Sequence, residues 1–319
     1  MLIDLPLDEL RTFRPEVSRP TDFDAFWTTT LAESRELSSS PDFSLRDSPL
    51  IGVRVYDVTF SGFGGHPISG WLLTTATGQS RGTVIEYLGY GGGRGLPHER
   101  LAWVTAGFAY FVMDTRGQGS GWGTGGVTPD PVGSGPAGTS FVTRGLPDPE
   151  DYYYRRVYAD AALAVDAMRA APVDSPGILV TGNSQGGGVA LAVAGLAEGL
   201  SGVMPDVPFL CYFQRGMDVS DSEPGYGDLV RFLGVHRGSE ERVFETLAYF
   251  DGVNFARDAT APALFSAGLR DPVSPPSTVF AAANHYAGAQ VVVYPHNRHE
   301  GGEAFHWVRQ VEWVTGLGL

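Results

Sequence analysis

Residues 182–186, with the sequence Gly-Asn-Ser-Gln-Gly, fit the G-x-S-x-G pattern that presents a nucleophilic serine. An apolar run, 178–181, precedes them, and a run of small and apolar residues, 187–198, follows; this is the strand–turn–helix context of a nucleophile elbow. The glycines permit the sharp turn, because a Cβ there would collide with the neighbouring strand and helix. The pattern predicts Ser184 as a nucleophile at the carboxyl edge of a sheet; the alternative is a small-residue turn of another α/β protein.

A serine hydroxyl is a weak nucleophile that needs a base, and the base needs an acid to orient it. In proteins with a nucleophile elbow, both partners follow the serine at the ends of later strands. Asp271 comes soon after the apolar run 263–267. Asp251 and Asp258 are alternatives, but they precede that run and would lie at the opposite edge of the sheet. We therefore expect Asp271 to orient the imidazole.

Three histidines follow the last apolar run, 291–294, and each could be the base: His296, His299 and His306. His299 lies in a loop just before two glycines, where the chain can turn inward. His296 adjoins the strand end, and His306 falls within the next helical segment. Because the base must reach both the nucleophile and the acid, the spacing favours His299.

The cluster of His296, His299, Glu300 and Glu303 could also bind a metal ion. Its spacing is not H-E-x-x-H, however, and the glycines at 301–302 would interrupt the helix which that motif requires. The chain also contains no lysine, which excludes Schiff-base chemistry and a P-loop. We therefore expect neither a metal nor a cofactor.

Stabilising a tetrahedral oxyanion requires two N–H groups aimed at one point. The residue after the nucleophile, Gln185, supplies one of them in an elbow. The glycine-rich segment 88–95 follows an earlier strand and lets its backbone approach a ligand closely. Within it, Tyr90 is the best-placed second donor.

A basic residue lies close to this predicted site. Arg116 follows another strand end at the same edge of the sheet. It could bind a substrate carboxylate or brace the loops through a buried ion pair, and we favour bracing because the Arg fork suits fixed carbonyls and carboxylates.

Short apolar runs alternate with helical patterns, which favours a mostly parallel sheet with helices on both faces, an α/β fold. The expected strands are 82–87, 108–113, 178–181, 263–267 and 291–294, and the expected helices are 97–105, 152–170, 187–198 and 240–250. Before them, 53–60 and 68–73 predict an antiparallel hairpin. The 319 residues fit one domain, 1–319, with an N-terminal arm and helix over about 1–50 and a Gly/Pro-rich insertion over about 117–147.

The composition limits the classes of partner. The net charge of −14 disfavours binding to nucleic acid or to anionic membranes. The single cysteine, Cys211, excludes an intrachain disulfide, and its apolar surroundings predict a buried, inert thiol. No apolar run is long enough to span a membrane, and no basic, apolar leader is evident at the start of the chain. We therefore expect a soluble, cytoplasmic protein.

At these residues the chain resembles carbohydrate esterase family 7, the acetyl xylan esterase and cephalosporin C deacetylase group. Three motifs carry the resemblance: 116–118, 182–187 and 299–300. Three further segments extend it over effectively the whole chain: 22–27, 152–157 and 249–255. The departures are Pro272, where an asparagine is expected after the acid, and the stretch 121–138, and they bear on substrate preference more than on mechanism.

The resemblance implies an α/β-hydrolase fold with Ser184, Asp271 and His299 as the triad and Tyr90 and Gln185 as oxyanion donors. It implies removal of acetyl groups from short xylo-oligosaccharides and cephalosporin C through an acetyl-serine intermediate. It also implies a cytoplasmic homohexamer whose active sites face an inner cavity. The alternatives are a lipase-like carboxylesterase or a peptidase of the same fold, and a catalytically silent binding or scaffold protein.

Overall fold

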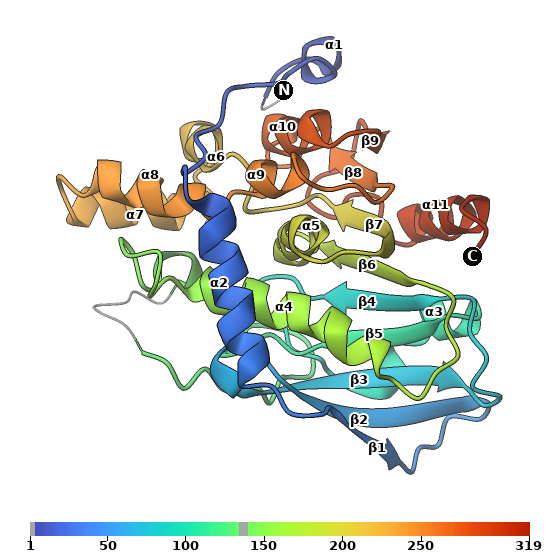
Figure 1. The fold of residues 1–319 in the computed structure, drawn as a ribbon. Coiled ribbons are helices and arrows are strands. Elements are labelled where there is room, and N and C mark those ends of the chain that lie inside the picture. The colour runs from blue at the N-terminus through green and yellow to red at the C-terminus, as the bar shows by residue number, and fades with distance from the viewer. Residues whose placement is uncertain (1–3, 134–139) are drawn as a thin grey trace.

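The computed structural model describes residues 4–133 and 140–319. Their strands form a nine-stranded sheet in the order β1-β2-β3-β5-β4-β6-β7-β8-β9, with helices on both faces (Figure 1). The strands are β1 (Asp42–Arg46), β2 (Val53–Ser61), β3 (Pro67–Thr75), β4 (Thr83–Tyr87), β5 (Ala109–Met113), β6 (Ile178–Asn183), β7 (Leu200–Asp206), β8 (Leu264–Gly268) and β9 (Gln290–Tyr294). The pairings among β1, β2, β3 and β5 are antiparallel, and those from β5 to β9 are parallel. The expected mostly parallel sheet is confirmed.

Helices cover both faces of this sheet. They are α1 (Leu7–Leu10), α2 (Phe23–Glu36), α3 (Ala102–Thr105), α4 (Tyr153–Arg169), α5 (Gln185–Leu196), α6 (Phe213–Val219), α7 (Tyr226–Val235), α8 (Glu240–Ala248), α9 (Gly252–Ala256), α10 (Pro276–His285) and α11 (Glu303–Gly316). Helices α4, α5, α9 and α10 pack on one face, and α3 and α11 pack on the other. Helix α2 crosses over α4 as an outer layer (Figure 1).

Successive residues of the central strands face opposite layers of the core. In β4, Ile85 packs with the α4–α5 layer and Val84 packs with the α3–α11 layer. In β6, Val180 and Leu179 divide in the same way. Both faces are covered, so these strands carry apolar residues on both faces instead of on one alone. The two layers bury the sheet and leave its carboxyl edge to carry the loops.

Helix α4 is buried on nearly all sides, because it lies between the sheet and α2. Its tyrosines point their hydroxyls at fixed acceptors: Tyr152 donates to the carbonyl of Val142 at 2.8 Å, and Tyr158 donates to that of Phe250 at 3.1 Å. Burial raises the pKa of both phenols well above the ordinary value. These contacts help to fix the helix beneath the loops.

Two of the departures from the expected elements have a clear local cause. The expected helix 97–105 is a 3₁₀ helix, η2 (Pro97–Glu99), followed by the single turn α3, because the backbone leaves helical geometry at Arg100 with φ −118° and ψ 49°. Strand β7 was not expected, since Gly202 and Pro205 interrupt its apolar pattern. A short strand buried in the middle of a parallel sheet gives only a weak periodic signal.

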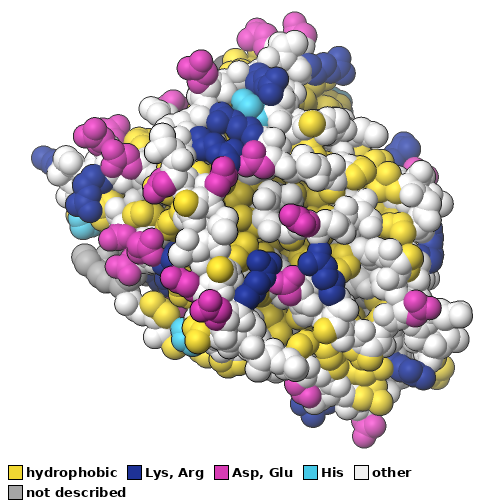
Figure 2. Space-filling model, viewed as in Figure 1, with side chains coloured by type: hydrophobic (Ala, Val, Ile, Leu, Met, Phe, Trp, Pro, Cys, Tyr) yellow, Lys and Arg dark blue, Asp and Glu magenta, His cyan; other side chains and the backbone are white. Residues whose placement is uncertain are grey.

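Both basic and acidic side chains occupy the face of the molecule that is drawn. Figure 2 shows basic side chains interspersed with acidic ones there. Several form ion pairs, such as Arg19 with Asp258 at 2.5 Å and Arg35 with Asp166 at 2.9 Å. Within the described ranges, no helix is long and apolar enough to cross a membrane.

Candidate active site

Ser184 occupies the turn between β6 and α5 with φ 58° and ψ −118°. A residue other than glycine in such a conformation stores about 1–3 kcal/mol of strain, which the surrounding structure must hold. The Ser184 N–H donates to the carbonyl of Asp206 at 2.9 Å, and the Ser184 carbonyl accepts from the N–H of Phe209 at 2.9 Å. A Cβ at Gly182 or Gly186 would collide with backbone atoms. The sequence pattern is thus explained by crowding around a strained serine.

The three side chains that sequence reasoning selected lie in one hydrogen-bonded chain. The Oγ of Ser184 is 2.7 Å from Nε2 of His299. The Nδ1 of His299 is 2.8 Å from Oδ2 of Asp271. A carboxylate that accepts from Nδ1–H leaves Nε2 free to accept the serine proton. The arrangement can therefore deprotonate the serine as it attacks a carbonyl.

Asp271 is fully buried in a turn after β8. Its Oδ1 accepts from the N–H groups of Val273 at 2.8 Å and Ser274 at 2.9 Å, while Oδ2 faces the imidazole. This turn packs directly on the loop after β9, because the N–H of Arg270 donates to the carbonyl of Asn297 at 3.1 Å. The acid and the base are therefore held by segments that also hydrogen-bond each other.

The loop that carries His299 is closed by the next residue. The Glu300 carboxylate accepts from the side-chain amide of Asn297 at 2.8 Å and from the N–H of Arg298 at 3.0 Å. Hydrogen bonds from backbone N–H groups, followed by that of Asn297, hold the pKa of Glu300 below its ordinary value. The acidic residue after the histidine therefore shapes the loop and does not face the serine.

The competing sequence candidates lie elsewhere. His296 is exposed, and His306 is buried against Asp206, with no contact to Ser184. Asp251 caps α9 by accepting from the N–H of Val253, and Asp258 pairs with Arg19 at the surface. Of the described residues, no three His, Cys, Asp or Glu side chains lie together as a metal site.

The two segments expected to supply oxyanion donors are joined through a pair of buried glutamine side chains. Gln118 Nε2 donates to Gln185 Oε1 at 2.9 Å, and Gln118 Oε1 accepts from the N–H of Gly91 at 2.7 Å. Gln185 Nε2 in turn donates to the carbonyl of Leu88 at 3.1 Å. The elbow and the loop after β4 are thereby fixed relative to each other. Sequence reasoning missed the Gln118 side chain, although the motif 116–118 contained it.

Tyr90 is anchored at both its side chain and its main chain. Its hydroxyl lies 2.9 Å from Ser140 Oγ and also accepts from the N–H of Phe141, and its ring packs edge-on against the Phe141 ring at 5.4 Å. Its carbonyl accepts from the indole N–H of Trp122 at 2.7 Å. Burial raises the pKa of the phenol. Both described parts of the insertion therefore hold the loop that carries Tyr90; part of the stretch 121–138 lies outside the described residues.

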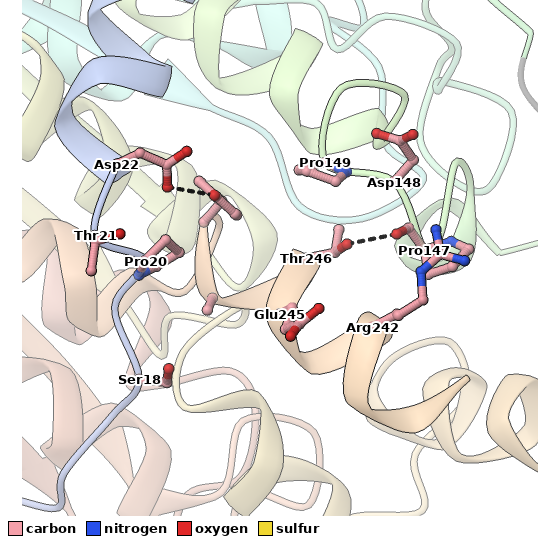
Figure 3. Close-up of a pocket in the computed structure, with 12 residues that line it drawn as sticks. Ser18, Pro20, Thr21, Asp22, Pro147, Asp148, Pro149, Arg242, Glu245 and Thr246 are labelled. Atoms are coloured by element: carbon pink, nitrogen blue, oxygen red, sulfur yellow. Dashed lines mark hydrogen bonds between the residues drawn. The ribbon is translucent and has the colours of Figure 1, made fainter. Parts of the chain in front are cut away.

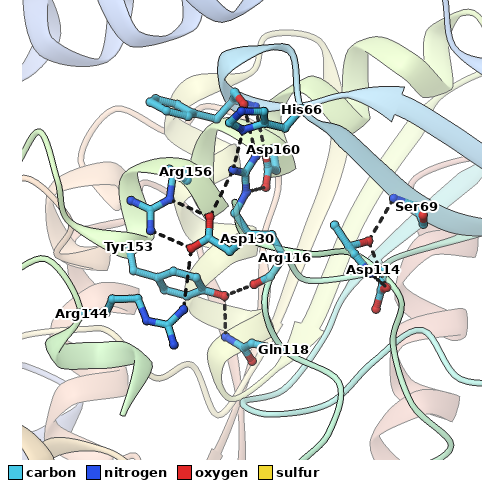
Figure 4. Close-up of polar contacts among 12 residues, drawn as sticks. His66, Ser69, Asp114, Arg116, Gln118, Asp130, Arg144, Tyr153, Arg156 and Asp160 are labelled. Carbon is cyan, nitrogen blue, oxygen red and sulfur yellow. Dashed lines mark hydrogen bonds and ion pairs between the residues drawn. The ribbon is translucent and has the colours of Figure 1, made fainter. Parts of the chain in front are cut away.

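Arg116 is fully buried at the start of the insertion (Figure 4). It forms two hydrogen bonds to Asp160 of α4, at 2.5 and 2.6 Å, and lies 3.6 Å from Asp130 of the insertion. Asp130 also pairs with Arg156 at 2.8 Å and with Arg144 at 3.7 Å. Burial disfavours the charged guanidinium, but the two carboxylates keep the pKa of Arg116 above its ordinary value. These contacts brace the insertion against α4 and leave the Arg116 guanidinium inaccessible to a substrate.

A surface hollow of about 420 Å³ lies between the N-terminal arm, the 147–149 loop and α8 (Figure 3). No triad residue lines it. The Tyr249 hydroxyl donates to Asp22 at 2.6 Å, and that of Thr246 donates to the carbonyl of Pro147 at 2.9 Å. Desolvation and the Asp22 carboxylate raise the pKa of Tyr249 to about 12. The segments 22–27 and 249–255, which share in the family resemblance, thus dock the N-terminal arm onto α8 instead of contributing to the triad.

With this geometry in view, comparison with known proteins is informative. The family model for acetyl xylan esterase (AXE1) matches residues 1–317. The chain belongs to the acetyl xylan esterase family. Among solved structures it is similar to an acetyl xylan esterase from Paenibacillus sp. R4, with 38% identity, a TM-score of 0.90, and 98% of this chain and 99% of that chain covered. It is also similar to acetyl xylan esterase 1 from Thermoanaerobacterium sp. JW/SL YS485, with 30% identity, a TM-score of 0.89 and the same coverage.

A curated relative is longer than the chain. The chain is 27% identical over 294 residues to the acetyl esterase Axe7A of Xylanibacter ruminicola. That match covers 90% of this chain but 65% of the longer esterase. The family and the α/β-hydrolase fold expected from the sequence are both confirmed.

Proposed function

We propose that the protein is a serine esterase that removes acetyl groups from small acetylated substrates through an acetyl-Ser184 intermediate. The observation that carries the proposal is the continuous chain from Ser184 through His299 to the buried Asp271, with contacts of 2.7 and 2.8 Å. Its occurrence in a member of the acetyl xylan esterase family supports the acetyl ester as substrate.

Acylation begins when Ser184 Oγ attacks the acetyl carbonyl and its proton passes to Nε2 of His299. Asp271 accepts from Nδ1–H and stabilises the imidazolium that forms. The carbon–alcohol oxygen bond then breaks, and His299 protonates the departing alcohol. Water, deprotonated by the same imidazole, then attacks the acetyl-serine. The bond between the acetyl carbon and Ser184 Oγ breaks, His299 returns the proton to Oγ, and acetate is released.

The oxyanion of each tetrahedral intermediate is stabilised by the N–H groups of Gln185 and Tyr90. Gln185 is the first residue of α5, where helical N–H groups have no partner within the helix. The glutamine pair that joins the elbow to the loop after β4 supports a fixed aim for both donors. Donors fixed before the reaction need no reorganisation in the transition state.

The proposed substrates are acetylated xylo-oligosaccharides and cephalosporin C, both of which present a small acyl group on a larger leaving group. The names of the two similar solved esterases support the first of these. We also propose a cytoplasmic homohexamer, in keeping with the family resemblance of the sequence. Light scattering on the purified protein tests the assembly, since a monomer would exclude it.

The decisive experiment compares acetate release from acetylated xylo-oligosaccharides and cephalosporin C with hydrolysis of butyryl and octanoyl esters. Ser184→Ala is expected to lower kcat about 10⁴- to 10⁶-fold. Acetyl-selective activity that disappears in this variant supports the deacetylase. Hydrolysis of long chains would favour a lipase-like esterase, cleavage of peptides would favour a peptidase, and an inactive wild-type protein would favour a silent relative.

A further inference from the structure

His306 is a buried histidine that the proposed reaction does not use. It lies in the first turn of α11, the helix that follows the loop carrying His299, and is 1% exposed. Its N–H donates to the carbonyl of Gly302 at 3.1 Å. A buried imidazole is costly unless its two nitrogens meet polar partners. Both of its nitrogens face polar groups, and each of those groups belongs to a residue that supports the triad.

The first partner is Asp206, at the end of β7. The Nε2 of His306 lies 2.9 Å from Asp206 Oδ1, at ion-pair distance but off the direction of a hydrogen bond. Gln310, one turn further along α11, donates to the same carboxylate at 2.9 Å. The main-chain carbonyl of Asp206 accepts from the N–H of Ser184 at 2.9 Å. Helix α11 therefore contacts Asp206, and the carbonyl of Asp206 in turn holds the strained nucleophile Ser184.

The second partner is Tyr294, the last residue of β9. Its hydroxyl lies 3.0 Å from Nδ1 of His306, and the two rings meet edge to face. The Tyr294 carbonyl accepts from the N–H of Leu269, two residues before the acid, at 3.0 Å. It also accepts from the N–H of Asn297, two residues before the base, at 3.4 Å. Tyr294 thus supports the acid-bearing turn and the base-bearing loop together.

We propose that His306 is a positioning residue for the triad. It contacts Asp206 with one nitrogen and Tyr294 with the other. In this way it fixes the distance between the end of β7, which holds the serine, and the end of β9, which holds the acid and the base. A displacement of about 1 Å between reacting groups can reduce a rate about 100-fold. The inference rests on the proposed function, in which Ser184 transfers its proton to His299.

Replacement of His306 by residues that imitate one nitrogen tests the two contacts separately. His306→Leu removes both polar contacts. A glutamine places its amide near the position of Nε2, and an asparagine places its amide near that of Nδ1. Tyr294→Phe removes only the hydroxyl on the second side. His296→Asn, at an exposed histidine near the same loop, is the matched control.

The assay is hydrolysis of acetyl esters, with rates expressed per reactive serine as counted by phosphonate labelling. In His306→Leu we expect kcat to fall about 10- to 100-fold with KM within twofold, because the ring touches no substrate. His306→Gln and His306→Asn are expected to recover part of that loss, Tyr294→Phe to lose several-fold in kcat, and His296→Asn to match the wild type.

A wild-type kcat in His306→Leu would overturn the proposal, as would a loss confined to KM or to the number of reactive serines. If His306→Leu does not fold, Tyr294→Phe decides, and an unchanged kcat in that variant would also overturn it. Ser184→Ala is run in parallel. If that variant stays active, the proposed function fails; if it is inactive while all His306 variants match the wild type, only the positioning role fails.

Discussion

The buried charges around Arg116 make a quantitative prediction for Arg116→Met. Methionine replaces the aliphatic stem of the arginine but carries no charge, so the substitution leaves the Asp160 carboxylate buried without its two hydrogen bonds from Arg116. Asp130 loses one of three arginines but keeps Arg156 at 2.8 Å. The cost therefore arises mainly at Asp160, which is 1% exposed.

Removing one member of a buried ion pair costs about 3–5 kcal/mol of unfolding free energy, because the remaining charge has lost its compensation. At about 2.1 cal/mol/K per residue, unfolding of 319 residues has an entropy of about 0.7 kcal/mol/K. The unfolding midpoint of Arg116→Met should thus fall by about 5–7 °C. Adding Asp160→Leu removes the stranded carboxylate and should recover a large part of that loss.

The assay is thermal and urea unfolding of the two variants beside the wild type. Arg309→Met is the matched control, because its ion pair with Glu312 is exposed, with side chains 66% and 62% accessible. That control should change the midpoint by less than about 1 °C, since exposed pairs contribute little. If Arg116→Met behaves like Arg309→Met, or if Asp160→Leu deepens its defect, the buried network does not brace the fold as described.

Two further predictions concern the oxyanion segments and acid stability. Gln118→Leu leaves the N–H of Gly91, which donates to Gln118 at 2.7 Å, without its acceptor. The substitution should lower kcat about 10- to 100-fold through a cost of about 1–3 kcal/mol. An unchanged kcat in a steady-state esterase assay would show that the glutamine pair is dispensable. Burial raises the pKa of Asp251 from 3.8 to about 6 in the folded protein, so the folded state binds that proton more tightly and stability should fall as pH rises from about 4 to 6. The difference amounts to about 3 kcal/mol of unfolding free energy. The unfolding free energy of Asp251→Asn, measured with urea over this pH range, should lack this contribution to its pH dependence.

The parts of the fold that sequence could predict are those with a strong local signal. Strands β4, β5 and β6 are built around short apolar runs, and the glycines around Ser184 specify a turn that other residues cannot enter. Strand β7 gave no such signal, because its place in the sheet depends on parallel neighbours distant in the sequence. Helix 97–105 was overpredicted, since propensity did not show where the helix breaks at Arg100.

At the site, order along the chain was sufficient to select Asp271 and His299, because both follow strands that end at the same edge as β6. The side-chain partners could not be selected in this way. Gln118 joins segments that begin near residues 88 and 185, and Arg116 finds its carboxylate on α4, 44 residues later. Contacts of that range depend on how the insertion folds back over the sheet, for which no local pattern exists.

The support of the oxyanion segments consists of neutral groups. Gln118 and Gln185 are joined amide to amide, and the phenols of Tyr153 and Tyr154 complete their hydrogen bonds. Burial raises the pKa of both phenols far above the neutral range, so they keep their protons. A rise in pH above neutrality therefore leaves the hydrogen bonds of this scaffold unaltered. The two proposed donors would therefore stay aimed at the place where negative charge develops.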